Sequence, residues 1–447
     1  MSDVSNLHSR YNPVAEAERY LNALKVSGSV RFFILIEPGD GYIIPLLKQK
    51  FPSAALIALH ISDSFMNRDG CSSWSPKEGM LQRFLERTIP DVEASAIFVL
   101  EWRPALRVFG DRYLKLLSET VDFIKRIDAN TRTTKAFAKK WARNFFHTIT
   151  LLKTVYYNIH TETPIIVVGA GPSLEESLKQ IRNAQHYAFI LAVSAAVPCL
   201  LNADIIPDFI VSTDGGTWSL FHLYECVRTP QSIPCIVSMQ AAIPSQCSMM
   251  PFILLNDGNV WQHIILEKLH IPFMSMLQRG TVSATAVDYA LRMTCASVGI
   301  VGFDMAPKDI QNHARPYSLD RFEEETVSRF NPLYHKHFVR THLLNAGNSL
   351  NIYASWFKQQ VPHYPPRLYT IGHNNPVFNS LPLWAEHVHT KKLVYSVIHC
   401  EYTVQYIAKT VGEMLENPII KETVASSLAT DRSSLTLHDI IHALKPQ

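Results

Sequence analysis

The sequence predicts an α/β protein: a central Rossmann-like sheet covered by helices, a smaller N-terminal α/β domain and a helical C-terminal domain. Short apolar runs alternate with segments of helical spacing, which favours parallel strands buried on both faces. Two of these runs, at 32–36 and 165–168, lead directly into glycine turns. A length of 447 residues suits two or three domains.

The N-terminal domain is predicted over residues 1–115. FFILI at 32–36 is a strand that enters the glycine turn at 39–41, and further strands are expected at 55–60 and 96–100. Residues 112–160 contain neither Gly nor Pro and keep helical spacing. We therefore expect a helical connector over 116–160.

The central domain is predicted over residues 161–376, with the C-terminal helical domain over 377–447. The strands expected in the central domain are 165–168, 189–197, 208–214, 234–239, 251–255 and 296–304. After them comes an insertion at about 307–376, with an acidic helix at SLDRFEEETV, and the C-terminal domain ends in TLHDIIHALKP. Ligands of parallel sheets bind outside the carboxyl ends of the strands, so we expect a site at that edge.

The turn in PIIVVGAGPSLEESL, residues 164–178, is the first candidate site. Gly169 and Gly171 let the backbone approach a ligand closely, and the following helix N-terminus favours a phosphate. The third glycine of a dinucleotide fingerprint would fall at Leu174, and the Walker lysine is missing. The alternative is a structural turn in which Ser173 caps the helix.

Other glycine or polar residues follow the remaining strands. They are Ser194, Asp214, Gly302 and Asp304. Thr281-Val282-Ser283 precedes a helix and could hold a carboxylate or phosphate, or Thr281 or Ser283 could be only its N-cap. The two aspartates could bind a ribose hydroxyl, a polar acceptor or a metal, or could simply terminate their strands.

His313, in QNHARPY, is the candidate general base because histidine titrates near neutral pH. Arg315 and Tyr317 follow it and could steady a leaving phosphate. His335, His337 and His342 form another group, but the sequence places no Cys or clear carboxylate partner beside them. No metal site is therefore expected.

Composition excludes several classes of protein. Charged residues make up 18% of the chain and the net charge is +3, too small to indicate nucleic-acid binding. No apolar run reaches the ~20 residues of a membrane span and the N-terminus lacks a signal-peptide pattern, so a cytoplasmic protein is expected. Seven cysteines without CxxC pairing indicate buried, reduced thiols.

The ordered motifs GAGPSLEESL, IIPDFIVSTD, RGTVSATAVDYAL, SVGIVGFDMA and NHARPY resemble those of the motility accessory factor (Maf) family of flagellin glycosyltransferases. The central domain of that family is similar to bacterial sialyltransferases that use CMP-activated sugars. The resemblance covers roughly residues 130–375.

The resemblance implies transfer of a nonulosonic acid, pseudaminic or legionaminic, from a CMP donor to Ser or Thr of flagellin, supporting motility. The donor-binding residues it implies are Gly169, Ala170, Gly171, Pro172, Ser173, Ser194, Asp214, Thr281, Val282, Ser283 and Gly302. His313, Asp304 and Tyr317 would be catalytic, and no cofactor or metal would be required. The sialyltransferases carry an asparagine where this chain has Ala170.

Two alternatives remain open. Some related archaeal proteins are pterin pyrophosphokinases, in which ATP and magnesium would bind at the glycine turn, with Asp214 and Asp304 as metal ligands. The other alternative is a non-catalytic flagellin-binding assembly factor.

Overall fold

The computed structural model describes residues 7–26, 30–66, 71–89, 96–227, 232–276, 279–346, 349–372, 378, 381–384 and 390–427. The chain groups into two compact units, residues 1–137 and 138–447. This grouping does not test the division into four parts predicted above, which stays a prediction. Each unit contains its own hydrophobic core.

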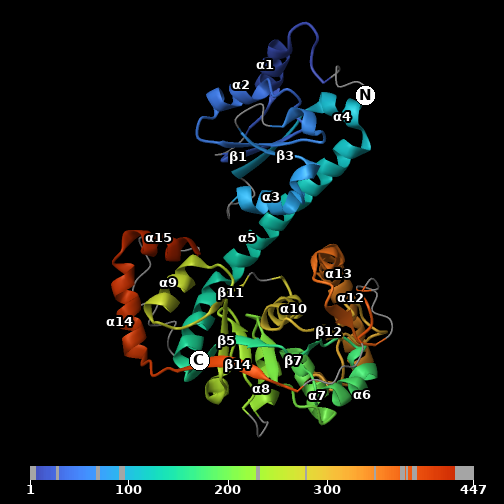
Figure 1. Ribbon diagram of the computed structural model, residues 1–447, viewed down its shortest axis with the longest axis vertical. Helices are drawn as coiled ribbons and strands as arrows, with labels where there is room; N and C mark the ends of the chain where they lie inside the picture. The colour runs from blue at the N-terminus through green and yellow to red at the C-terminus, as the bar shows by residue number, and fades with distance from the viewer. Residues whose placement is uncertain are drawn as a thin grey trace. The chain divides into compact units, whose positions relative to one another are not determined.

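The first unit is built on a four-stranded parallel sheet of order β3-β2-β1-β4 (Figure 1). Its strands are β1 (Phe32–Ile36), β2 (Ala55–Leu59), β3 (Ser72–Trp74) and β4 (Ile97–Glu101). Its helices are α1 (Pro13–Ala23), α2 (Ile43–Lys50), α3 (Leu81–Thr88) and α4 (Arg103–Phe109), with short 3₁₀ turns at Asp63–Phe65 and Pro76–Glu78. The three strands predicted here are confirmed: the apolar runs of β1 and β2 are almost entirely buried, and that of β4 is partly buried.

Helix α5 (Asp111–Leu151) begins in the first unit and ends in the second. The prediction of helix up to residue 160 is wrong at its end, because Thr154–Thr161 forms strand β5. The segment TVYYNIHT is rich in β-branched and aromatic residues, which fit a half-buried strand better than a helix.

The second unit contains a sheet of order β13-β12-β6-β7-β8-β9-β10-β5-β14, with β11 beside β10. Its strands besides β5 are β6 (Ile165–Val168), β7 (Phe189–Val193), β8 (Phe209–Ser212), β9 (Cys235–Ser238), β10 (Phe252–Asn256), β11 (Met274–Ser275), β12 (Val298–Val301), β13 (Leu368–Thr370) and β14 (Leu393–His399). All pairs are parallel except β14 with β5. The predicted Rossmann-like sheet is confirmed, and four of its strands, β7, β8, β9 and β12, are shorter than predicted.

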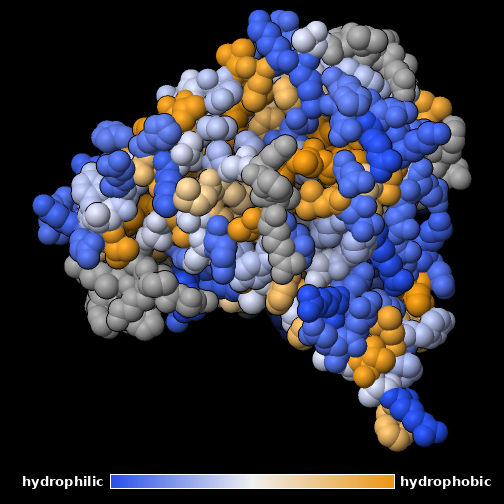
Figure 2. Space-filling view, turned by 90° about the horizontal axis from the view of Figure 1, so that it is seen from below, coloured by the Kyte–Doolittle hydropathy of each residue, from blue (hydrophilic) through white to orange (hydrophobic). Residues whose placement is uncertain are grey.

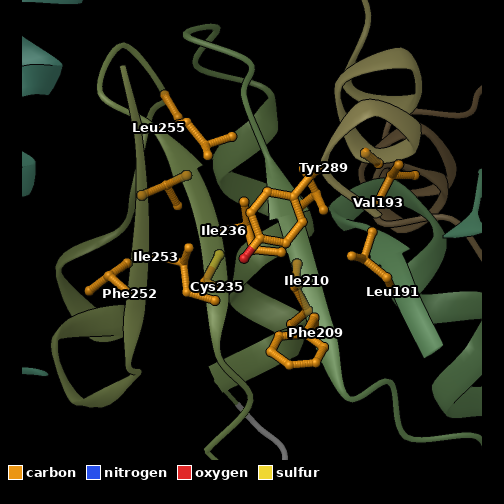
Figure 3. Packing of buried hydrophobic residues seen from close by; sticks show 14 of the residues in the cluster. Leu191, Val193, Phe209, Ile210, Cys235, Ile236, Phe252, Ile253, Leu255 and Tyr289 are labelled. Carbon is orange, nitrogen blue, oxygen red and sulfur yellow. The ribbon is translucent and has the colours of Figure 1, made fainter. Parts of the chain in front are cut away.

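Helices cover both faces of this sheet. They are α6 (Leu174–Ala184), α7 (Val197–Asn202), α8 (Ser219–Val227), α9 (Val260–Lys268) and α10 (Val282–Met293). In Figure 1, α6, α7 and α8 lie on the opposite side of the strands from α10. Figure 3 shows the ring of Tyr289, from α10, lying among Ile210, Cys235 and Ile236 of the central strands. Burial raises the pKa of the Tyr289 hydroxyl, which has no hydrogen-bond partner among the described residues.

The predicted insertion contains α11 (Asp320–Glu325), α12 (Leu333–Ala346) and α13 (Ser349–Gln360), so the acidic helix is confirmed. The C-terminal segment contains α14 (Val404–Leu415) and α15 (Pro418–Ser427), but the helix predicted through residues 393–399 is wrong. Those residues, LVYSVIH, form β14 and pair antiparallel with β5. The predicted TLHDIIHALKP helix lies outside the described residues.

The surface seen from below the view of Figure 1 mixes hydrophilic residues with separate hydrophobic patches (Figure 2). None of the helices that the structure describes combines the length and apolar character needed to span a bilayer.

Candidate functional site

The strand order of the second sheet reverses at β6. From β6 the chain proceeds through β7, β8, β9 and β10 in one direction, whereas β12 and β13 lie on the other side of β6. In sheets of this kind the ligand crevice lies outside the carboxyl ends of the strands at such a reversal. The turns that leave β6 and β12, residues 169–173 and 302–304, meet at this position.

These two turns pack backbone against backbone. The amide of Gly171 donates a hydrogen bond to the carbonyl of Gly302 over 2.9 Å. A Cβ added to Gly169 would lie 2.4 Å from the Gly302 carbonyl oxygen, and Gly302 itself has φ +70°. The glycines of the first turn therefore permit contact with the second turn, and their role in binding a ligand stays a prediction.

Asp304 occupies the N-terminal end of α6. Its Oδ2 accepts hydrogen bonds from the amide of Ser173, over 3.1 Å, and from the Ser173 hydroxyl, over 2.9 Å. Ser173 occupies the N-cap position of α6, as predicted, but its side chain makes no capping bond to the helix. Burial raises the pKa of Asp304, and the hydrogen bonds from Ser173 partly oppose that shift.

Residues 308–317 contact the start of α6 and the turn before it. The amide of Ala314 donates to the carbonyl of Ala170 over 2.9 Å, and the amide of Arg315 donates to Glu175 Oε1 over 2.8 Å. Lys308 Nζ lies 2.5 Å from Glu176 Oε1. These bonds bring the predicted residues His313 and Arg315 next to the glycine turn.

His313 and Tyr317 form a stacked pair. Their rings are nearly parallel, with centroids 4.2 Å apart. The Tyr317 hydroxyl lies 3.4 Å from Nε2 of His222, on α8, and His222 Nδ1 lies 3.2 Å from the Ser318 hydroxyl. Sequence reasoning missed His222, because in SLFHLYECV it looks like an ordinary position on an apolar helix.

A second group of polar residues lies at the end of β8. Asp214 is exposed, and its Oδ1 accepts a hydrogen bond from the Gly216 amide over 2.7 Å. Burial, with the Asp214 charge as the second cause, raises the pKa of Tyr353 on α13. A Cβ added to Gly280 would lie 3.7 Å from the Tyr353 ring. Tyr353, which the sequence did not single out, therefore lies beside the segment that starts α10 and within electrostatic range of Asp214.

The start of α10 contains the predicted Thr281-Val282-Ser283 motif. Thr281 is the N-cap, since its hydroxyl accepts a hydrogen bond from the Ala284 amide over 3.0 Å. The amides of Val282 and Ser283 occupy the first two helical positions, where no intrahelical acceptor exists. The N-cap interpretation is confirmed, and a ligand role stays a prediction.

The remaining predicted residues are less suited to direct contact with a ligand. Ser194 is buried at the start of a 3₁₀ turn, Ser194–Ala196. Asp214 and Asp304 follow β8 and β12, which are separated in the sheet by β6 and β7. The two aspartates therefore do not form one pair of adjacent carboxylates.

The chain is similar to one family model and to several known proteins. The sequence model of the family described as "6-hydroxymethylpterin diphosphokinase MptE-like" matches residues 135–309. An uncharacterized protein of Treponema pallidum (strain Nichols) is 29% identical over 321 residues, which are 71% of this chain and 68% of that protein. A second one is 31% identical over 120 residues, 26% of this chain and 57% of that protein.

Among solved structures, the Maf glycosyltransferase from Magnetospirillum magneticum AMB-1 matches with a TM-score of 0.42 and 12% identity, over 96% of this chain and 66% of that one. The MptE-like match contains the turns at 169–173 and 302–304, the end of β8 and the start of α10. The chain is thus similar to the MptE-like family over the part of the second unit in which the crevice lies.

Proposed function

We propose that the second unit is a glycosyltransferase that moves a nonulosonic acid from a CMP donor to a hydroxyl group of a protein acceptor. The observation that carries this proposal is the placement of the His313–Tyr317 stack beside the crevice through the bond from Ala314 to Ala170. The motif resemblance described above supports the choice of donor, the choice of flagellin as acceptor, and a cytoplasmic location.

The reaction requires two events at the site. The acceptor hydroxyl must lose a proton, and the phosphate of CMP must leave the anomeric carbon with its charge stabilised. In this proposal His313 takes the proton through an imidazole nitrogen. Tyr317 and the amides of Val282 and Ser283 donate hydrogen bonds to the departing phosphate.

In this proposal the glycine turn at 169–173 does not bind the donor phosphate, although its sequence suggests that it does. The Ser173 amide already donates a hydrogen bond to the Asp304 carboxylate, so a phosphate bound at that amide would be repelled by the like charge. The start of α10 has Thr281 as its own cap and acidic residues are absent from its first turn, so its amides suit the donor phosphate better.

The MptE-like match favours a second candidate, diphosphate transfer from ATP. That reaction uses a magnesium ion bound to the phosphates, and carboxylates usually hold such an ion. Asp214 and Asp304 would have to act from different places along the sheet edge, and Asp304 already accepts two hydrogen bonds from Ser173. This geometry supports the kinase candidate less well.

Thermal-shift titration separates the candidates. CMP or CDP without metal should raise the melting temperature of the full chain if the proposal is right. Stabilisation by ATP with magnesium alone would reject it in favour of the kinase, and an unchanged melting temperature with every nucleotide would favour an assembly factor.

Catalysis needs its own test, with CMP-pseudaminic or CMP-legionaminic acid as donor, flagellin as acceptor and mass spectrometry as readout. His313→Ala should reduce transfer by about 10²-fold or more and leave CMP binding unchanged. His186→Ala, at an exposed histidine on the same unit, is the matched control. Full activity of His313→Ala would remove His313 from the mechanism.

A further inference from the structure

We propose that Asp320, Glu323 and His337 form a binding site for a divalent transition-metal ion. The two carboxylates come from α11 and the imidazole from α12. The proposal goes beyond the transferase reaction and does not depend on which donor is used.

The geometry suits a small cation. One ligand atom from each of the three residues lies within 4.8 Å of the other two. Around an ion with bond lengths of about 2.0–2.2 Å, neighbouring ligand atoms lie roughly 3–4 Å apart, so small side-chain rotations would complete the set. Because Asp320 and Glu323 are three positions apart on α11, their side chains share one face of that helix.

The surroundings of the three residues favour an added positive charge. His337 has only 8% of its side chain exposed and Glu323 has 19%. Nδ1 of His337 lies 3.4 Å from Glu323 Oε2. Asp320 and Glu323 are partly buried carboxylates that repel each other. A divalent cation would neutralise both.

The protein also holds these ligands in place through other groups. Oδ2 of Asp320 accepts a hydrogen bond from the Tyr317 amide over 3.0 Å. Lys336 Nζ, on α12, donates to the Glu323 carbonyl on α11 over 3.1 Å and also to the hydroxyl of Thr326. Such contacts orient metal ligands and join the two helices. The bond to Tyr317 also links the proposed metal site to the residue stacked on His313.

The three histidines of α12 have different surroundings. His335 is exposed, and His342 Nδ1 lies 3.2 Å from the Phe338 carbonyl oxygen, so only His337 joins the carboxylates. The expectation that no metal binds here rested on a missing carboxylate partner in the neighbouring sequence. α11 supplies two such partners from more than ten residues upstream.

The donor set indicates the class of ion. One imidazole nitrogen with two carboxylates suits Zn²⁺, Mn²⁺ or Fe²⁺, whereas Mg²⁺ and Ca²⁺ prefer oxygen ligands alone. Mn²⁺ is a useful probe beside Zn²⁺, because it binds thiols such as that of the exposed Cys295 weakly.

The test uses the tag-free full chain, stripped with EDTA and then titrated with Mn²⁺ or Zn²⁺ by calorimetry, with bound metal counted by mass spectrometry. We expect one equivalent of metal, and an affinity at least about tenfold lower in Glu323→Gln and in His337→Ala. Glu325→Gln and His335→Ala, at exposed positions of the same two helices, are the matched controls and should bind as the unaltered chain does.

Absence of binding in the unaltered chain would overturn the proposal, as would equal affinity in Glu323→Gln and its control. If His337→Ala fails to fold, the isosteric Glu323→Gln decides. Because metal content is the readout, failure of the nucleotide titrations would leave this result unaffected.

Discussion

Asp304 accepts two hydrogen bonds from Ser173, one from its amide and one from its hydroxyl, at 3.1 and 2.9 Å. The two residues come from turns that leave adjacent strands, β6 and β12. The start of α6 is therefore capped by a carboxylate from a distant part of the sequence. This contact ties together the two turns at the reversal of strand order.

Asp304→Ala should lower the free energy of unfolding by about 1–3 kcal/mol, because the Ser173 amide and hydroxyl lose their acceptor. Asp304→Asn keeps an oxygen that can accept both bonds and should cost less. Urea unfolding of both variants checks this. Equal losses would indicate that the negative charge, rather than the hydrogen bonds, holds the turns together.

The pH dependence of stability should change in Asp304→Asn. Burial raises the pKa of Asp304 above its ordinary value of 3.8, so the folded chain holds this proton more tightly than the unfolded chain. The contribution of Asp304 is therefore complete below pH 3.8 and is lost as the pH rises through the raised pKa.

The free energy of unfolding of the unaltered chain, minus that of Asp304→Asn, should consequently fall as the pH rises from 3.8 through the raised pKa of Asp304. Urea unfolding at several pH values measures this difference. A difference that rises with pH would mean that the hydrogen bonds from Ser173 outweigh burial.

Gly171→Ala should destabilise the second unit by about 3 kcal/mol or more, through overpacking. The new Cβ would lie 1.9 Å from Asp304 Oδ2 and 2.8 Å from the Gly302 carbonyl oxygen. Gly216→Ala is the control, since its nearest neighbour is a side-chain oxygen of Asp214 at 3.0 Å, which can shift. Thermal unfolding of the two variants should differ clearly, and equal melting temperatures would contradict the close packing of the turns.

Thiol reactivity should separate the cysteines. Cys295 is exposed, whereas burial raises the pKa of Cys199 to about 11 and that of Cys247 to about 12. Thiolate is the reactive form, so Cys295 should react with an aromatic disulfide reagent well before these two. Cys295→Ser should remove a fast phase that Cys247→Ser retains, and loss of that phase in Cys247→Ser would contradict the assignment.

The strands of the second sheet were predictable because burial on both faces leaves continuous apolar runs, as at Ile165–Val168. Strand β5 and the edge strand β14 were not, since their half-buried mixtures of polar and apolar residues also fit a helix. Their assignment depends on pairing between segments more than 200 residues apart.

Only part of the candidate site could be predicted from the sequence, because its contacts also depend on segments far apart in the chain. The motifs located the turns correctly, but the neighbour of Gly169 is Gly302, and no local pattern reveals that contact. The same holds for His222 and for the carboxylates that face His337, which depend on tertiary packing. Residue type and spacing indicated which side chains could do chemistry, while the fold decided which of them meet.

The position of β14 has a consequence for synthesis of the chain on the ribosome. β5 pairs with β10 through one residue pair, Val155 with Phe252, but with β14 at six positions. The nascent chain must therefore grow by about 240 residues beyond β5 before its main partner emerges, which takes roughly 10–50 s at ordinary rates of translation. During that interval β5 presents an open strand edge, and this edge is where a cotranslational chaperone would have most to protect.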